Sequence, residues 1–186
     1  MKTTVVTPAD GEPVSLSDAK EYLRIGHAGE DALVANLIAG ARARIERAAG
    51  VAIVSRTLLT TTDCWPRDMA ARGLRLRPAP VQALVAVRTT GSAVTDITNR
   101  FRLRSGVLCL RPFHQLPTVD PDGSIEIEFE TGFGAAGAVP ADLIMAVKLT
   151  FAHAFQRREA GGREEDAEGL PAEVQRLLRP YREARI

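Results

Sequence analysis

The sequence predicts an α+β fold: a helical core of two long and two short helices, with a β-rich insertion between the second and third helices. Two observations predict this class. Apolar residues recur at helical spacing near both ends of the chain, whereas the middle consists of short β-prone runs separated by turn residues. No repeat with a period of roughly 20 to 50 residues is visible, which excludes solenoids and propellers.

Length and composition favour one domain. The chain has 186 residues, of which 45% are hydrophobic and 25% charged, and a chain of this size buries about 70% of its unfolded surface without needing a disulfide scaffold. We therefore expect a single domain over residues 1–186, with a helical part at 1–50, a β-rich part at 51–131 and a second helical part at 139–186.

The N-terminal part predicts an extended start and two helices. Ser15 has the character of an N-cap and Asp18 suits the positive end of the helix dipole, so a short helix begins there and ends before Gly26. A longer helix of about 20 residues follows, with acidic residues ahead of it and Gly50 as its C-cap. Its expected apolar stripe is Leu33, Leu37, Ala41, Ile45 and Ala48.

The middle of the chain predicts short strands. The expected runs are Val51–Thr62, Leu74–Arg77, Val81–Thr89, Phe101–Leu103, Val107–Leu110 and Ser124–Glu130, with a hairpin turn at Arg104–Gly106. The last run alternates strictly between apolar and acidic residues, which predicts one buried face and one wet face.

Two helices are predicted in the C-terminal part. The first opens near Pro140, and its stripe is Leu143, Ala146, Val147, Thr150, Phe151, Ala154 and Phe155. A glycine-bearing acidic stretch over 161–169 is expected to be a mobile loop. A last short helix begins near Pro171 and ends by Pro180, and the tail after it is expected to fray or to dock on another protein.

Charge is unevenly distributed although the net charge is only +1. The stretch 67–111 holds nine arginines against two acidic residues, Asp68 and Asp96, while 120–130 holds five carboxylates and no base. Such polarisation suits subunit contacts or the steering of partners, and it is equally compatible with a solvated surface. The arginine-rich β region also suits contact with a phosphate backbone, which leaves a DNA-binding regulatory protein as an alternative.

The stretch Gly132–Gly137 spells G-x-G-x-x-G between a predicted strand and a predicted helix. A dinucleotide site needs this motif inside a βαβ unit, and here no strand is expected after the helix, so we interpret the stretch as a flexible connection and expect no cofactor. Cys64 and Cys109, like the three histidines, match no metal-ligand spacing. We therefore expect no metal site and no enzyme activity, and no run is long and apolar enough for a membrane span.

The order of these patterns resembles a known family. The N-terminal half of head–tail connector, or adaptor, proteins of long-tailed bacteriophages, prophages and gene transfer agents is similar to Pro13–Ile25, Glu30–Leu33 and Ala41–Glu46. The second half of that family is similar to Phe129–Gly134, Val139–Leu143 and Leu170–Val174.

This resemblance implies a structural virion protein made in the bacterial host cytoplasm and located in the neck of a phage-like particle. It implies a ring of twelve copies that binds the portal vertex, joins the capsid to stopper or other neck and tail-proximal proteins, and surrounds DNA that it contacts non-specifically. Family relatives dock on the portal through the C-terminal segment, which implies portal binding by Arg176, Leu177, Leu178, Tyr181, Arg182 and Ile186. We assign the subunit interface or DNA channel to Arg100, Arg102, Arg104, Glu126, Glu128 and Glu130.

Overall fold

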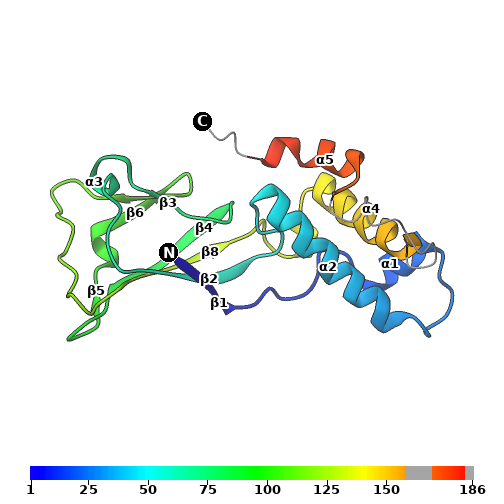
Figure 1. Ribbon diagram of the computed structural model, residues 1–186, viewed down its shortest axis with the longest axis horizontal. Helices are drawn as coiled ribbons and strands as arrows, with labels where there is room; N and C mark the ends of the chain where they lie inside the picture. Colours follow the sequence, from blue (N-terminus) through cyan, green and yellow to red (C-terminus); the bar gives the residue numbers. More distant parts are fainter. Residues whose placement is uncertain (158–168, 183–186) are drawn as a thin grey trace. The chain divides into compact units, whose positions relative to one another are not determined.

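The computed structural model confirms the α+β class and describes residues 1–157 and 169–182. The chain divides into two compact units (Figure 1). The β unit comprises Met1–Asp10 and Ser55–Gly132, and the helical unit comprises Gly11–Val54 and Phe133–Ile186. The chain therefore passes between the units three times, and the expectation of a single domain stays a prediction.

An antiparallel five-stranded sheet with β8 at its centre forms one layer of the β unit, in the order β1-β2-β8-β4-β5. Its strands are β1 (Lys2–Thr7), β2 (Arg56–Thr62), β4 (Val81–Thr89), β5 (Thr95–Asp96) and β8 (Ile125–Thr131). The predicted alternation of β8 is confirmed, because Ile125, Ile127 and Phe129 are fully buried and the glutamates between them lie on the other face.

The second layer is an antiparallel three-stranded sheet in the order β3-β7-β6. Its strands are β3 (Leu74–Arg75), β6 (Phe101–Arg104) and β7 (Val107–Leu110). The predicted hairpin between β6 and β7 is confirmed: Ser105 and Gly106 both have positive φ, at 49° and 75°, as a type I′ turn requires.

The two sheets share one hydrophobic core. Phe129 of β8, Leu108 of β7 and Phe101 of β6 are buried in the same cluster, where Phe101 also stacks on the Trp65 ring at 5.3 Å between centroids. A short helix, α3 (Met69–Arg72), adds the fully buried Met69 to this cluster. The β unit is thus a two-layer sandwich in which each sheet has one inner and one outer face.

Three features of the β unit differ from the sequence predictions. The extended start contains β1, whose six residues are all exposed and so show no burial pattern in the sequence. The strand expected over Val51–Thr62 begins only at Arg56, and the apolar residues 51–54 are buried in the helical unit instead. A short apolar run has the same hydropathy in a buried connection as in a strand, which explains the error. The sequence reading also did not anticipate α3 and β5.

The helical unit is built from α1 (Leu16–Leu23), α2 (Asp31–Ala49), α4 (Ala141–Arg157) and α5 (Ala172–Leu178). α2 packs along α4, and α5 packs on α4 (Figure 1). The cap at Ser15 is confirmed, since its hydroxyl accepts the Asp18 N–H at 3.1 Å, and Gly50 ends α2 in the left-handed conformation. The part of the loop expected over 161–169 that precedes Gly169 lies outside the described residues.

The buried stripe of α4 is as predicted from Leu143 to Phe151, but that of α2 is shifted by one residue at most positions. Leu33 is 37% exposed, and the buried side chains of α2 are Val34, Ile38, Ala41, Ile45, Glu46 and Ala49. Two neighbouring apolar rows run along this helix, and hydropathy alone cannot tell which row faces the core.

Candidate assembly surfaces

The outer face of the three-stranded sheet is basic. Arg75, Val107 and Arg104 lie in one cross-strand row, and Cys109 lies opposite Arg102 in the next. The three arginines are exposed, and the three strands contain no acidic residue. Because residues directly opposite each other share a face of a sheet, these five side chains form one surface, here called the arginine face.

The outer face of the five-stranded sheet is acidic. Glu126, Glu128 and Glu130 lie opposite Thr61, Leu59 and Thr57 of β2. These six side chains are here called the glutamate face. Glu130 is exposed, and the other five side chains are partly exposed.

Two bases and one further acid border the glutamate face. Arg88 of β4 lies opposite Glu126 and binds Glu128 through Nη1 and Oε2 at 3.1 Å. Lys2 of β1 lies opposite Thr61, and Asp96 of β5 lies opposite Arg88. The hydrogen bonds from Thr98 lower the pKa of Asp96 below its ordinary value. Four carboxylates against two bases leave this surface acidic.

The two charged faces point to opposite sides of the β unit, because the inner faces of both sheets meet in the shared core. The structure therefore brings Arg102 and Arg104 together and separates them from the three glutamates. Arg100 lies in a 3₁₀ turn, η1 (Thr98–Arg100), where its guanidinium donates to the Gln115 carbonyl at 3.4 Å. Arg75 was missed by the sequence reading, although the alternation Leu74-Arg75-Leu76 was its signal.

The predicted portal-binding residues lie on α5 and on the 3₁₀ turn η4 (Arg179–Tyr181) that follows it. Arg176 and Arg182 are exposed and Leu177 is partly exposed, whereas Leu178 is fully buried and packs inside the helical unit. Ile186 lies outside the described residues. The exposed Arg179, three residues from both Arg176 and Arg182, was missed although its spacing is visible in the sequence.

Tyr181 is anchored to the helical unit rather than free in solution. Its ring meets Phe133 edge-to-face at 6.0 Å between centroids. Burial, together with the nearby Asp142 carboxylate, raises the pKa of its hydroxyl above the ordinary value. This contact fixes the end of η4, so the arginines beside it project from an ordered segment.

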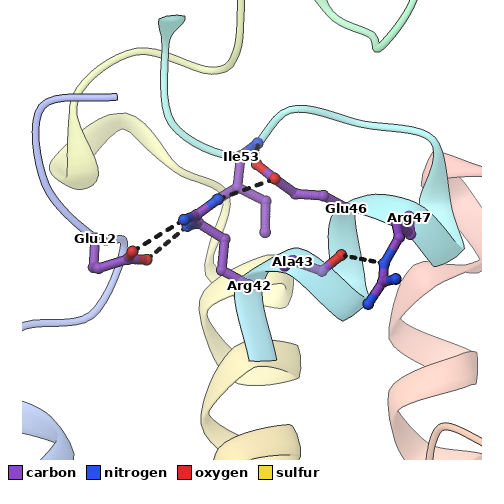
Figure 2. Close-up of polar contacts among 6 residues, drawn as sticks. All are labelled: Glu12, Arg42, Ala43, Glu46, Arg47 and Ile53. Carbon is purple, nitrogen blue, oxygen red and sulfur yellow. Dashed lines mark hydrogen bonds and ion pairs between the residues drawn. The ribbon is translucent and has the colours of Figure 1, made fainter. Parts of the chain in front are cut away.

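A polar network ties the segment before α1 and the segment after α2 to the C-terminal half of α2 (Figure 2). Arg42 donates to both carboxylate oxygens of Glu12, at 2.7 and 3.1 Å, and to Glu46 at 3.1 Å. The other oxygen of the buried Glu46 accepts the Ile53 N–H at 2.9 Å. The hydrogen bonds to Glu12, followed by the charges of Glu12 and Glu46, raise the pKa of Arg42 against the effect of burial.

The network is a structural feature rather than a reactive one. Glu12 and Ile53 lie close to two of the points where the chain passes between units, and the Phe133 N–H donates to the Ile53 carbonyl at 3.2 Å beside the third. The buried Glu46 carboxylate is paired with the Arg42 guanidinium and accepts the Ile53 N–H, as a buried charge requires. It therefore holds the connecting segments on the helical side.

The stretch Gly132–Gly137 lacks the surroundings of a dinucleotide site. It follows an antiparallel strand, and its last two residues begin a 3₁₀ turn, η2 (Ala136–Ala138), that precedes α4. Gly132 and Gly134 have φ angles of 124° and 120°, a conformation that glycine adopts readily because it has no Cβ. No strand follows α4 within the described residues, so this stretch is a connection.

Residues 1–157 and 169–182 contain no group of three His, Cys, Asp or Glu side chains placed to hold a metal ion. Among the same residues, no helix has the length and hydropathy that crossing a membrane would require. An open groove of about 520 Å³ in the helical unit is lined by residues of α1, α4 and α5, including Tyr22 and His153, and a second groove of about 290 Å³ lies between α2 and α4.

These observations define an α+β chain whose described surface offers charged faces for contacts with other molecules. Comparisons with solved structures give this class a particular context. The chain is similar to a chain in the neck of an empty gene transfer agent particle, with a TM-score of 0.83 and 26% identity, covering 100% of this chain and 97% of the other.

A chain in the virion of a native gene transfer agent particle matches with the same TM-score of 0.83, 26% identity and coverage of 100% and 97%. A third, from the neck of the native particle computed with C12 symmetry, matches at a TM-score of 0.80 and 25% identity, again over 100% and 97%. No protein-family model and no curated protein match the sequence. The similarity therefore spans both units and points to the neck of a virion-like particle.

Proposed function

We propose that this chain is a non-enzymatic structural protein of the neck of a phage-like or gene transfer agent particle, where its copies form a ring that acts as a head–tail adaptor. The observation that carries the proposal is the similarity over the whole length of both chains at a TM-score of 0.83. A match to one unit alone would indicate a shared module, whereas a match to both units supports the same role in the particle.

The proposal includes a cyclic arrangement of identical copies around the DNA channel. It is supported by the C6 and C12 symmetries of the similar necks, since each symmetry describes a ring of repeated subunits. We propose twelve copies, with the capsid portal on one side and stopper or other tail-proximal neck proteins on the other. Contacts with the DNA that passes through the ring are non-specific.

We further propose that the C-terminal segment of the chain binds the portal. The exposed Arg176, Arg179 and Arg182 present three cations on an ordered helix end, which suits an acidic surface on the portal. Leu177 is partly exposed beside them and supplies an apolar contact. Leu178 holds the helix to its own unit, so a change there would report on folding instead of binding.

Portal capture tests this proposal. The portal protein encoded by the same genome is immobilised, and the full chain, a chain ending at Pro180, and the variant Arg176→Glu/Arg179→Glu are compared. The full chain is expected to bind, and both altered chains are expected to lose at least about tenfold in affinity, because like charges or a missing contact replace complementary ones. A control variant, Arg67→Glu, changes an exposed arginine of the β unit and should bind normally.

Failure of the full chain to bind the portal in any form, free or in assembled particles, would contradict the adaptor role. Binding by the full chain that survives both C-terminal changes would leave the adaptor role standing and assign the portal contact to another surface.

A further inference from the structure

We propose that neighbouring copies in the ring join through the β unit, with the arginine face of one copy seated on the glutamate face of the next. The inference rests on the proposed function, because it names the partner of these surfaces as a second copy of the same chain. It goes beyond that function by assigning the contact to two specific sheet faces.

A cyclic ring needs a heterologous interface, in which each copy offers two different surfaces to its two neighbours. The arginine face and the glutamate face belong to opposite layers of one sandwich and point away from each other. One copy can therefore contact a neighbour on each side at the same time, which two surfaces on the same side could not do.

The two faces carry opposite net charge. The arginine face carries three cations and its strands contain no carboxylate, whereas on the opposite sheet Glu126 and Glu130 flank the Glu128–Arg88 ion pair. Contact between two arginine faces or two glutamate faces would place like charges opposite each other, at a cost of several kcal/mol. The charges thus disfavour a two-fold dimer of like faces and favour a head-to-tail contact.

Each of the two faces also has partly exposed apolar side chains. Val107 and Cys109 lie partly exposed between the arginines, and Leu59 lies partly exposed opposite Glu128. An interface of this kind has an apolar centre with a polar rim. Each face therefore has a small apolar centre bordered by charged side chains, and the two faces differ in the sign of their net charge.

Charge exchange between the two faces tests the proposal. One variant, Arg102→Glu/Arg104→Glu, makes the arginine face acidic, and a second, Glu126→Arg/Glu130→Arg, makes the glutamate face basic. Each is produced alone in particle-forming cells, and its copies per particle neck are counted. We expect each variant alone to lose at least about tenfold in incorporation, because every subunit contact then joins like charges.

Two combinations should restore assembly. A chain that carries all four substitutions regains complementary faces and is expected within about twofold of the wild-type level. Co-production of the two variants should restore it as well, because in an alternating ring each altered face meets the other altered face and each native face meets a native one. Such a ring closes only with an even number of copies, as the C12 symmetry of the similar neck allows.

Urea unfolding of each variant as a monomer is the control for folding. If a double variant fails to fold, the milder single variants Arg104→Glu and Glu130→Arg provide a second pair. Normal incorporation of either double variant, or no rescue by the exchanged chain, would overturn the proposed interface. Loss of binding to double-stranded DNA by the arginine variant, with rings intact, would also overturn it and assign the face to DNA.

These outcomes are separable from the function itself. Portal capture of the wild-type chain together with normal rings of the charge variants rejects only the interface. Absence of portal binding by the wild-type chain rejects the adaptor role.

Discussion

The β unit and the helical unit use charged side chains in different ways. In the helical unit, Arg42 and the buried Glu46 bind each other and two connecting segments, so their charges serve folding. In the β unit, charges such as Arg102 and Glu130 stand on outer sheet faces above an apolar core. Removal of the buried Glu46 charge should therefore damage folding, whereas removal of the exposed charge of Arg102 or Glu130 should damage association.

The largest effect is expected from Glu46→Ala. The substitution leaves the buried Ile53 N–H without its acceptor and removes one partner of Arg42, so the free energy of unfolding should fall by about 3 kcal/mol. Urea denaturation measures the loss. The matched control is Glu21→Ala, an exposed helical glutamate, which should change stability by less than about 0.5 kcal/mol. Equal effects of the two variants would refute the folding role of Glu46.

A smaller loss is expected from Thr131→Val at the end of β8. The buried Thr131 hydroxyl contacts the carbonyls of Pro78 and Pro80 at 2.6 and 2.9 Å, and valine has nearly the same shape without the donor. The free energy of unfolding should fall by about 1 to 2 kcal/mol. Thr131→Ser keeps the hydroxyl donor. If this variant is as unstable in thermal denaturation as Thr131→Val, loss of the hydroxyl contacts is not the cause of the lower stability.

Glu130→Gln should be close to neutral for the isolated chain. Its side chain is exposed on the glutamate face, so its stability should change by less than about 0.5 kcal/mol while assembly weakens. Urea denaturation and incorporation into particles are measured on the same preparation. A stability loss comparable with that of Glu46→Ala would mean that this charge serves folding, which would abolish the contrast between the units.

The smallest effect is expected at Asp120, an exposed carboxylate that accepts hydrogen bonds from the Ser92 N–H and hydroxyl at 2.9 and 2.8 Å. These bonds lower the pKa of Asp120 below its ordinary value. Folding lowers the pKa of Asp120, so its ionised carboxylate stabilises the folded chain at a pH above the pKa of the unfolded chain. This stabilisation is lost as the pH falls through the pKa of the folded chain. Asp120→Ala should therefore melt slightly below the wild type at pH 7, and the gap should close in acid. A gap independent of pH would exclude the carboxylate.

Much of the fold could be predicted because its pattern is local. The stripe of α4 and the alternation of β8 are periodic within their own segments, and the caps at Ser15 and Gly50 depend on a few neighbouring residues. The extended start was predicted, but its pairing as β1 escaped prediction because its six exposed residues carry no burial pattern and its register partners in β2 lie 50 to 59 residues away. The row of α2 that faces the core depended in the same way on packing against α4.

The candidate surfaces show the same division. The uneven charge distribution of the sequence singled out the arginines and the glutamates, but it could not show that they occupy opposite faces of a sandwich; the residues singled out were Arg100, Arg102, Arg104, Glu126, Glu128 and Glu130. That separation depends on the pairing of β3 with β7 and of β8 with β2, which joins residues distant in sequence. Arg75 belongs to the basic surface only through this pairing.

The proposed function requires that this chain form a ring on the portal. The most direct test is to purify the wild-type chain in complex with the portal of its own genome and to measure the native mass of the complex. The account predicts a closed ring with a single defined copy number, twelve per portal ring. A monomer that shows no affinity for the portal, or a complex with scattered, non-integral occupancy, would contradict it.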